Sequence, residues 1–147
     1  MPAAPEAVWS VLADPESYGD WVVGSKRIRG ADEAFPAPGT RFHHTIGFGP
    51  FELDDHTKVL AAHPPQLLRL RAKGRPLGTA EVTLRLTPLD GGTHVEMTEN
   101  PDGLFSPLAL NPVVQLATDR RNVKALRRLE ALVLQRASGP GSAAKTK

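Results

Sequence analysis

Short segments in which apolar and polar residues alternate fill the middle of the chain. In the clearest one, Ala80, Val82, Leu84 and Leu86 alternate with threonine, glutamate and arginine. Because successive strand residues point to opposite faces, this pattern predicts a sheet with one apolar and one solvated face. Glycine, proline and aspartate turns separate the segments, which favours an antiparallel meander. The predicted strands are residues 26–29, 40–48, 51–60, 66–73, 79–87 and 93–99.

Helical spacing of apolar residues marks both ends of the chain. It predicts a helix over residues 5–13, a short second helix over residues 18–21, and a long helix that begins at Asn111-Pro112 and extends to about Arg136. A one-sided sheet needs a cover for its apolar face, and the long helix is the segment long enough to supply it. The sequence therefore predicts an α+β fold in which this helix closes over a curved antiparallel sheet, around a pocket.

The long helix has two different sides. At about 100° per residue, one side is cationic and the opposite side is apolar. The cationic residues are Arg120, Arg121, Lys124, Arg127 and Arg128, and the apolar ones are Leu126, Leu129 and Val133. Toward the N-terminus the inward stripe continues as Gln115, Thr118, Asp119 and Asn122. A buried polar group without a partner costs about 1–3 kcal/mol, so this stripe indicates a cavity that holds water or a ligand. The alternative is a solvated end of the sheet.

Polar residues also interrupt the predicted inner face of the sheet. Phe42, His44 and Ile46 share one face of their strand, and Asp55 and Thr57 share the corresponding face of the next. If residues 47–50 form the connection, His44 lies opposite Leu53 and diagonal to Asp55. A carboxylate beside an imidazole can act as a general acid and base, which makes His44 and Asp55 catalytic candidates. The alternative is that His44 is only a hydrogen-bonded core residue.

These patterns together predict the residues around the pocket. Its deep end is expected to be dry, and its mouth is expected to be polar around Thr118, Asp119 and Asn122. The ligand would then be amphipathic. The predicted lining is Trp21, Phe42, His44, Ile46, Leu53, Asp55, Thr57, Leu70, Val82, Leu84, Met97, Gln115, Thr118, Asp119, Asn122 and Leu126.

Composition narrows the classes of function. A chain of 147 residues fits one domain, predicted over residues 1–137, with a disordered polar tail over residues 138–147. It has no cysteine, and its five histidines are not spaced as metal ligands, so we expect neither a metal nor a cofactor. A net charge of +2 and 5% aromatic residues argue against nucleic-acid binding. With no apolar run long enough to insert in a membrane, the expected location is the cytoplasm.

Several motifs together resemble one family over nearly the whole chain up to the tail. They are Ala4-Pro5-Glu6-Ala7-Val8-Trp9, Leu12-Ala13-Asp14-Pro15, Tyr18 with Trp21, Val23-Gly24, Pro38-Gly39-Thr40, Gly47-Phe48-Gly49-Pro50, Gly91-Gly92-Thr93 and Arg121-Asn122-Val123-Lys124-Ala125-Leu126. The chain is thereby similar to the polyketide cyclase/dehydrase-like branch of the START-related lipid-transport (SRPBCC) superfamily. The resemblance implies the helix-grip fold, also seen in the major birch pollen allergen, with a cavity between sheet and C-terminal helix. Members bind lipids, sterols or polyketides, and a minority cyclise or dehydrate polyketides.

The chain departs from this family pattern at its start. Family members begin with a strand before the first helix, and that strand lies beside the last one; here it is missing. Its loss would expose the strand over residues 93–99 as an edge. We expect either a start further upstream, in which case an extended version melts higher, or a homodimer through this edge.

Three functions fit the sequence. The first is binding or transport of a hydrophobic or amphipathic small molecule. The second is a polyketide aromatase/cyclase or dehydratase, in which Thr57 or Asn122 orients the substrate for His44 and Asp55. The third is an adaptor that docks an anionic partner on the cationic side of the long helix, although that side is expected to be only a solvated face.

Overall fold

A computed structural model describes residues 1–23, 25–48, 50–73, 79–102 and 112–139, with the backbone alone at some positions. The helices precede and follow the strands along the chain. The elements are α1 (Pro5–Leu12), a 3₁₀ turn η1 (Pro15–Ser17), α2 (Tyr18–Trp21), β1 (Ser25–Ala31), β2 (Arg41–Phe48), β3 (Phe51–His63), β4 (Leu67–Lys73), β5 (Thr79–Leu89), β6 (Gly92–Asp102) and α4 (Pro112–Ser138).

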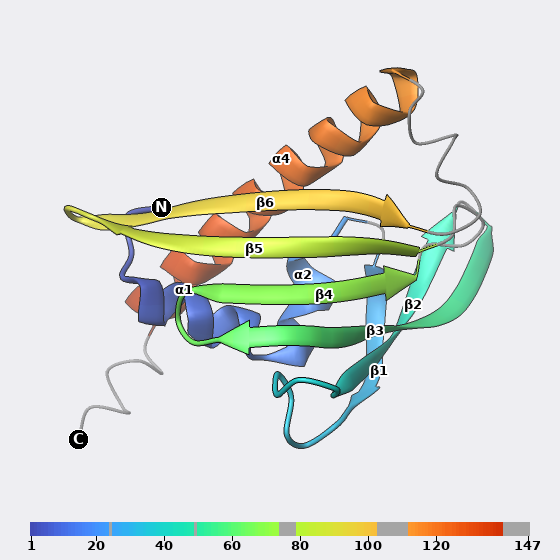
Figure 1. The fold of residues 1–147 in the computed structure, drawn as a ribbon, viewed down its shortest axis with the longest axis horizontal. Helices are drawn as coiled ribbons and strands as arrows, with labels where there is room; N and C mark the ends of the chain where they lie inside the picture. The colour runs from blue at the N-terminus through green and yellow to red at the C-terminus, as the bar shows by residue number, and fades with distance from the viewer. Residues whose placement is uncertain (24, 49, 74–78, 103–111, 140–147) are drawn as a thin grey trace.

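The six strands form one antiparallel sheet in the order β1-β2-β3-β4-β5-β6. The sheet curves strongly, so that β1 and β2 stand almost across the direction of β4, β5 and β6 (Figure 1). Helix α4 crosses one face of the sheet and contacts α1 and α2 on that same side. This is the predicted α+β helix-grip arrangement, with two short helices near the N-terminus.

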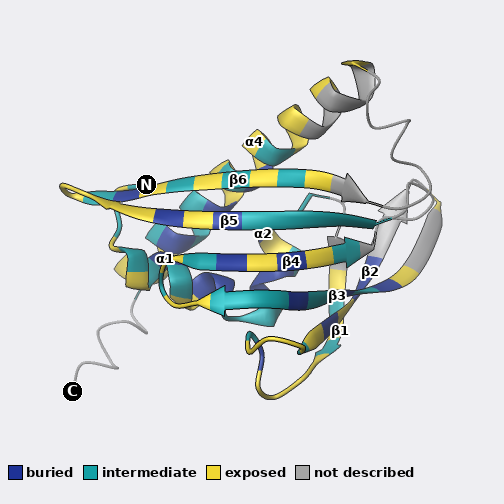
Figure 2. Cartoon of the chain, in the orientation of Figure 1, coloured by how far each residue is buried: buried dark blue, intermediate teal, exposed yellow. Residues whose placement is uncertain are grey.

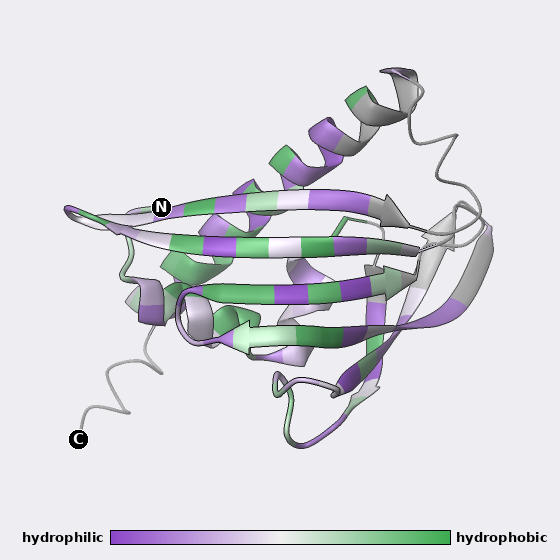
Figure 3. Ribbon diagram, in the orientation of Figure 1, coloured by the Kyte–Doolittle hydropathy of each residue, from purple (hydrophilic) through white to green (hydrophobic). Residues whose placement is uncertain are grey.

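The alternation of side chains decides which face is covered. Along β4 and β5, apolar and polar positions alternate (Figure 3), and the apolar positions share the buried face of the sheet. Leu68 and Leu84 are directly paired across these strands, and both are fully buried. Helix α4 adds Leu129 and Val133 to the same core, and α1 adds Val8, Val11 and Leu12. Figure 2 shows this burial concentrated toward the end of the sheet near α1.

A cluster of aromatic rings fills the other part of the core, between α2 and β2. The Tyr18 ring lies 5.0 Å from that of Trp21 and 4.6 Å from that of Phe42, measured between centroids. Phe35, from the segment between β1 and β2, packs edge-on against Tyr18 and Phe42. The Tyr18 hydroxyl donates to the Leu12 carbonyl at 2.7 Å. Burial, helped by the charge of Asp14, raises the pKa of Tyr18, so the phenol stays protonated.

The first residues of the chain lie against the edge strand β6. Met1 and Thr93 exchange two backbone hydrogen bonds of 2.8 Å each, and the Thr93 hydroxyl donates to the Ala3 carbonyl at 2.7 Å. In the described part of the chain no strand precedes α1, as the sequence predicted. Among the described residues, Met1 is the one whose backbone pairs with β6 on the side away from β5, so β6 is an edge strand of the sheet.

Gly92 allows this close approach of the chain start. A Cβ atom at Gly92 would overlap the carbonyl group of Met1, whereas a Cβ atom at Gly30 in β1 would meet nothing within 4 Å. We expect Gly92→Ala to displace Met1 and to lower the free energy of unfolding by about 1–2 kcal/mol. Gly30→Ala is the matched control, with no loss expected. Chemical denaturation of both variants measures the difference, and an equal response would contradict the role given to Gly92.

Candidate functional site

The register of β2 against β3 brings three polar side chains together on the inner face. Phe48 pairs with Phe51, so only residues 49 and 50 lie between the paired strands. The predicted connection over residues 47–50 is therefore wrong, because the ladder continues through Gly47 and Phe48. The shift places Asp55, not Leu53, directly opposite His44. Residues directly opposite each other on two antiparallel strands have Cβ atoms about 5 Å apart, close enough for the carboxylate and the imidazole to interact.

His44, Asp55 and Thr57 form a buried polar group, since each side chain belongs to a residue with 6% or less of its surface exposed. His44 Nε2 lies 3.1 Å from the Thr57 hydroxyl oxygen. Asp55 Oδ1 accepts a hydrogen bond from the backbone N–H of His56 at 3.0 Å. The other ring nitrogen, His44 Nδ1, is buried and has no hydrogen-bond partner among the described residues. This nitrogen is a candidate contact for a ligand or a water molecule.

Burial lowers the pKa of His44, and the charges of Arg29, His56 and His43 lower it further, while the opposing charge of Asp55 raises it in part. The imidazole is therefore neutral at neutral pH. A neutral imidazole carries one donor and one acceptor nitrogen, so it can accept a proton or hold a polar group. The site thus has the groups for acid–base chemistry as well as for binding.

The lowered pKa has a consequence for stability. The unfolded chain binds a proton at His44 more readily than the folded protein does. The stability that depends on a neutral His44 is therefore fully present above the ordinary histidine pKa of 6.5, and it is lost as the pH falls below that value. We expect the melting temperature of the wild type to fall more steeply between pH 7.5 and about 5 than that of His44→Gln. Calorimetry across this range measures both slopes, and parallel slopes would show that His44 protonates without cost.

The structure distributes the predicted lining residues unevenly. Trp21, Phe42, Leu70 and Leu84 are buried in the core, together with the polar group of His44, Asp55 and Thr57. Val82, Met97, Asn122 and Leu126 are half-buried. The side chains of Ile46, Leu53, Gln115 and Thr118 lie outside the described residues.

Asp119, predicted at the polar mouth of the pocket, is exposed in the structure, so it does not belong to the buried part of the inward stripe. The buried residues Ala125, Leu129 and Val133 define the inner side of α4. At about 100° per residue, Asp119 lies at the margin of that side, whereas Asn122 lies within it. The cationic side is confirmed as exposed over Arg120, Arg121, Lys124, Arg127 and Arg128.

Burial of the inner face falls toward one corner of the sheet. In the row Val59-Leu70-Val82, the first two residues are buried and Val82 is only half-buried. In the next row, Thr57 is buried, while Ala72 and Ala80 are half-buried. These inward-facing side chains are therefore not sealed by the described part of α4. We call the half-buried positions Ala72, Ala80 and Val82 the open corner.

An ion pair that the sequence analysis missed lies beside the open corner. Arg121 of α4 donates from one guanidinium nitrogen to both carboxylate oxygens of Glu99, at 2.6 and 2.8 Å. Glu99 pairs with Val82 and shares the inward face of β6. The signal in the sequence was the alternation of Val95, Met97 and Glu99, which puts a carboxylate on an otherwise apolar face. The pair joins the helix to the sheet next to Val82.

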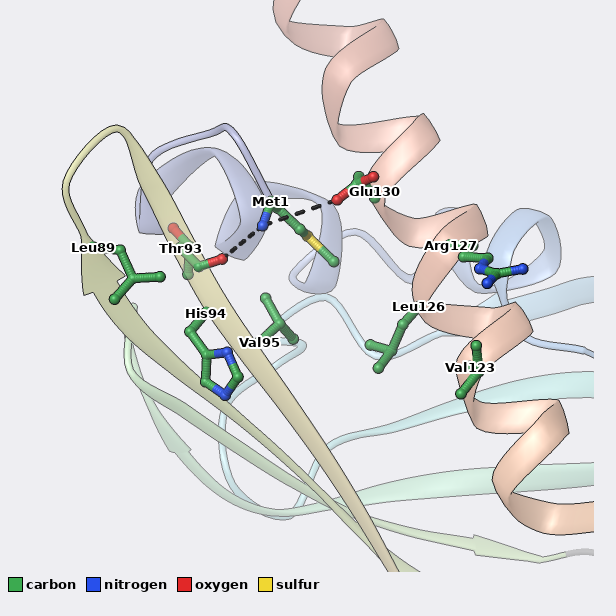
Figure 4. A pocket seen from close by; sticks show the side chains of 9 residues that line it. All are labelled: Met1, Leu89, Thr93, His94, Val95, Val123, Leu126, Arg127 and Glu130. Carbon is green, nitrogen blue, oxygen red and sulfur yellow. Dashed lines mark hydrogen bonds and ion pairs between the residues drawn. The ribbon is translucent and has the colours of Figure 1, made fainter. Parts of the chain in front are cut away.

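An open groove of about 310 Å³ runs between α4 and the edge strand β6. Figure 4 shows Val95 of β6 and Leu126 of α4 directed into it from opposite sides, and Met1 above them, between Thr93 and Glu130. The groove is lined by Met1, Leu89, Thr93, His94, Val95, Val123, Leu126, Arg127 and Glu130. Val95 and Leu126 also pack against the core, so the groove borders the packed region between sheet and helix.

No three histidine, aspartate or glutamate side chains in the described ranges gather closely enough to bind a metal ion. None of the helices described here has a sufficiently long apolar stretch to span a bilayer.

Comparison with known proteins identifies the family. The chain is similar in structure to protein NE0264 from Nitrosomonas europaea (16% identity, 95% of this chain and 92% of that chain covered, TM-score 0.74). It is also similar to a protein from Rhodobacter sphaeroides (24% identity, 91% and 87% covered, TM-score 0.70) and to Ara h 8.0201 (15% identity, 92% and 93% covered, TM-score 0.69). No curated protein matches the sequence. The family model described as polyketide cyclase/dehydrase and lipid transport matches residues 1–134, and the chain belongs to this family.

Proposed function

We propose that the protein binds a small hydrophobic or amphipathic molecule between the sheet and α4, at the open corner. The observation that carries the proposal is the half-buried state of inward-facing apolar residues, of which Val82 is the central one. An apolar face directed at a helix but left partly exposed gains stability when a ligand removes it from water. The family is described by polyketide and lipid-transport functions, which supports a ligand of this class.

The polar groups near this corner indicate an amphipathic ligand. The open corner provides apolar contact, while the buried group at Thr57 and the Glu99–Arg121 ion pair stand at its borders. Two buried ring nitrogens, Trp21 Nε1 and His44 Nδ1, have no hydrogen-bond partner among the described residues. Leaving a buried polar atom unpaired costs about 1–3 kcal/mol. A ligand with a hydrogen-bonding end would recover this energy if that end reached His44.

A bulky side chain placed at the open corner tests the proposed ligand binding. We expect the fluorescent probe 1-anilinonaphthalene-8-sulfonate to bind the wild type saturably, and Val82→Trp to weaken binding at least about tenfold, because the indole occupies the same space. Thr83→Trp is the matched control, since the neighbouring side chain points to the opposite face of β5. Titration of the three proteins measures the affinities. Equal loss in both variants, or none in Val82→Trp, would place the ligand elsewhere.

A second candidate function is a polyketide aromatase/cyclase or dehydratase. The observation that favours it is the pairing of His44 with Asp55 in a buried site beside Thr57. A neutral imidazole there can remove a proton alpha to a carbonyl and return it to a leaving oxygen. With a short poly-β-ketone thioester as substrate, His44→Gln should abolish turnover and keep probe binding. Turnover that survives this change would remove the candidate.

We further propose that the protein acts in the cytoplasm on a small-molecule partner, without nucleic acid, as a monomer or as a homodimer joined through β6. The edge supports the dimer, because among the described residues the backbone of Met1 pairs with β6 at Thr93, and the strand continues to Asp102. Light scattering at increasing protein concentration separates the two states.

A further inference from the structure

Helix α4 exposes two large apolar side chains on its outer side. Leu116 and Val123 are 51% and 49% exposed, and with Leu89 they are the large apolar residues left exposed among those described. Seven residues, or about two turns, separate Leu116 and Val123, so both lie on the same side of the helix. In the view of Figure 1 the N-terminal turns of α4 lie beyond the edge strand β6. This side of α4 has no cover from the described elements.

Cationic side chains surround these two apolar residues. Arg120 and Arg127 follow Leu116 and Val123 by four residues each, which puts all four along one stripe. Lys124 and Arg128 lie next to the stripe and are exposed as well. None of these four cations forms an ion pair with another described residue, whereas Arg121 is held by Glu99. We call Leu116, Arg120, Val123, Lys124, Arg127 and Arg128 the outer face of α4.

We propose that the outer face of α4 docks the protein peripherally on an anionic phospholipid surface. Lipid phosphates attract the four cations, and each cation near such a surface strengthens binding by roughly fivefold. Leu116 and Val123 would enter the boundary between headgroups and acyl chains, as the apolar residues of interfacial helices do. The long arginine and lysine side chains allow both contacts at once, because they extend toward the phosphates while the helix lies flat.

The arrangement fits a lipid surface better than a protein partner. The centre of a protein interface is depleted of charged residues, but here cations alternate with the apolar residues along the stripe. A fluid anionic surface accepts this mixture without a matching set of carboxylates. Asp119 and Glu130 lie to the side of the outer face that borders the groove, so the cations dominate its centre.

The groove between α4 and β6 opens beside the outer face. Val123 and Arg127 belong to both, so a docked protein would hold the groove next to the lipid headgroups (Figure 4). An amphipathic molecule could then pass from the bilayer into the space between sheet and helix. This transfer step rests on the proposed ligand binding, whereas docking itself does not.

Vesicle flotation of the ligand-free protein tests the docking. We expect binding to vesicles of phosphatidylcholine with 40% phosphatidylglycerol at low salt, loss of this binding in about 0.5 M salt, and none to pure phosphatidylcholine. The double variant Arg120→Glu/Arg127→Glu should bind at least about twentyfold more weakly. Val123→Asp should also weaken binding, because it removes the apolar contact and adds a negative charge.

The control carries the same change in net charge at another place. Arg41→Glu/Arg85→Glu alters two exposed arginines of the sheet and should bind anionic vesicles with less than about threefold loss. Three results would overturn the proposal: equal binding to neutral vesicles, no binding to anionic vesicles, or an equal loss in both double variants. Binding to soluble poly-glutamate as strong as to vesicles would also overturn it, in favour of an acidic protein partner. Binding of 1-anilinonaphthalene-8-sulfonate to the same variants in solution measures separately whether the proposed ligand site is intact.

Discussion

Replacing Leu129 with alanine is expected to lower the free energy of unfolding by about 2–5 kcal/mol, the range for truncating a fully buried leucine. Leu129 has no exposed surface, and it lies on the side of α4 that meets the core shared with α1 and the sheet. The truncation removes apolar contact and leaves a cavity that the surrounding strands can close only in part. Urea denaturation at neutral pH measures the loss from the shift of the midpoint at a constant slope.

The control for Leu129 lies on the same helix. Val123 is 49% exposed, so Val123→Ala should change the free energy of unfolding by less than about 0.5 kcal/mol. Both substitutions place alanine in a helix, where leucine and valine differ in propensity by only a few tenths of a kcal/mol, so most of the difference between the variants reports burial. A loss below about 1 kcal/mol at Leu129 would mean that α4 is not firmly seated on the sheet. The helix would then be free to move in response to a ligand.

The elements in which apolar residues recur at a regular spacing could be predicted from the sequence. The alternation over Ala80, Val82, Leu84 and Leu86 located β5 and its inner face, and the spacing of Leu129 and Val133 located the inner face of α4. These spacings can be recognised because every second residue of a strand, or every third to fourth residue of a helix, faces the core and must be apolar. The strand ends were less predictable: β6 continues to Asp102, past the predicted end at Glu99.

The register of β2 against β3 could not be predicted, because it depends on how the chain turns. Both the predicted connection over residues 47–50 and the observed one keep His44 and Asp55 on the inner face, since the two differ by an even number of residues. The alternation of apolar and polar residues is therefore compatible with either connection. Only the pairs themselves decide whether Asp55 lies beside His44 or diagonal to it, and the candidate for acid–base chemistry depends on that difference.

The sequence pattern did not identify the partners in contacts between distant segments. Arg121 belongs by spacing to the cationic side of α4, yet its guanidinium reaches Glu99 of β6. The same holds for Phe35, which comes from a segment without any periodic pattern and packs against Tyr18. A sequence pattern indicates which face of its element a residue occupies. The residue that it contacts on another element is determined by the curvature of the sheet.

Tyr18 is the centre of the aromatic cluster, and Tyr18→Ala is expected to destabilise the protein by about 3–5 kcal/mol. Its ring contacts Trp21, Phe35 and Phe42, so truncation removes the common neighbour of three rings that come from separate segments. The cavity would border Phe42, whose ring lies 5.5 Å from that of His44. Thermal and urea denaturation measure the loss, with tryptophan fluorescence reporting the environment of Trp21.

Tyr18→Phe separates packing from hydrogen bonding. The phenylalanine ring keeps all three aromatic contacts and removes only the hydroxyl that donates to the Leu12 carbonyl at 2.7 Å. Leaving that carbonyl unpaired should cost about 1–2 kcal/mol, which is below the range expected for the alanine variant. If Tyr18→Phe were as damaging as Tyr18→Ala, the hydrogen bond to α1 would be the main stabilising contact. The expected order, a small loss for phenylalanine and a large one for alanine, follows from ring packing that supports both α2 and the inner face beside His44.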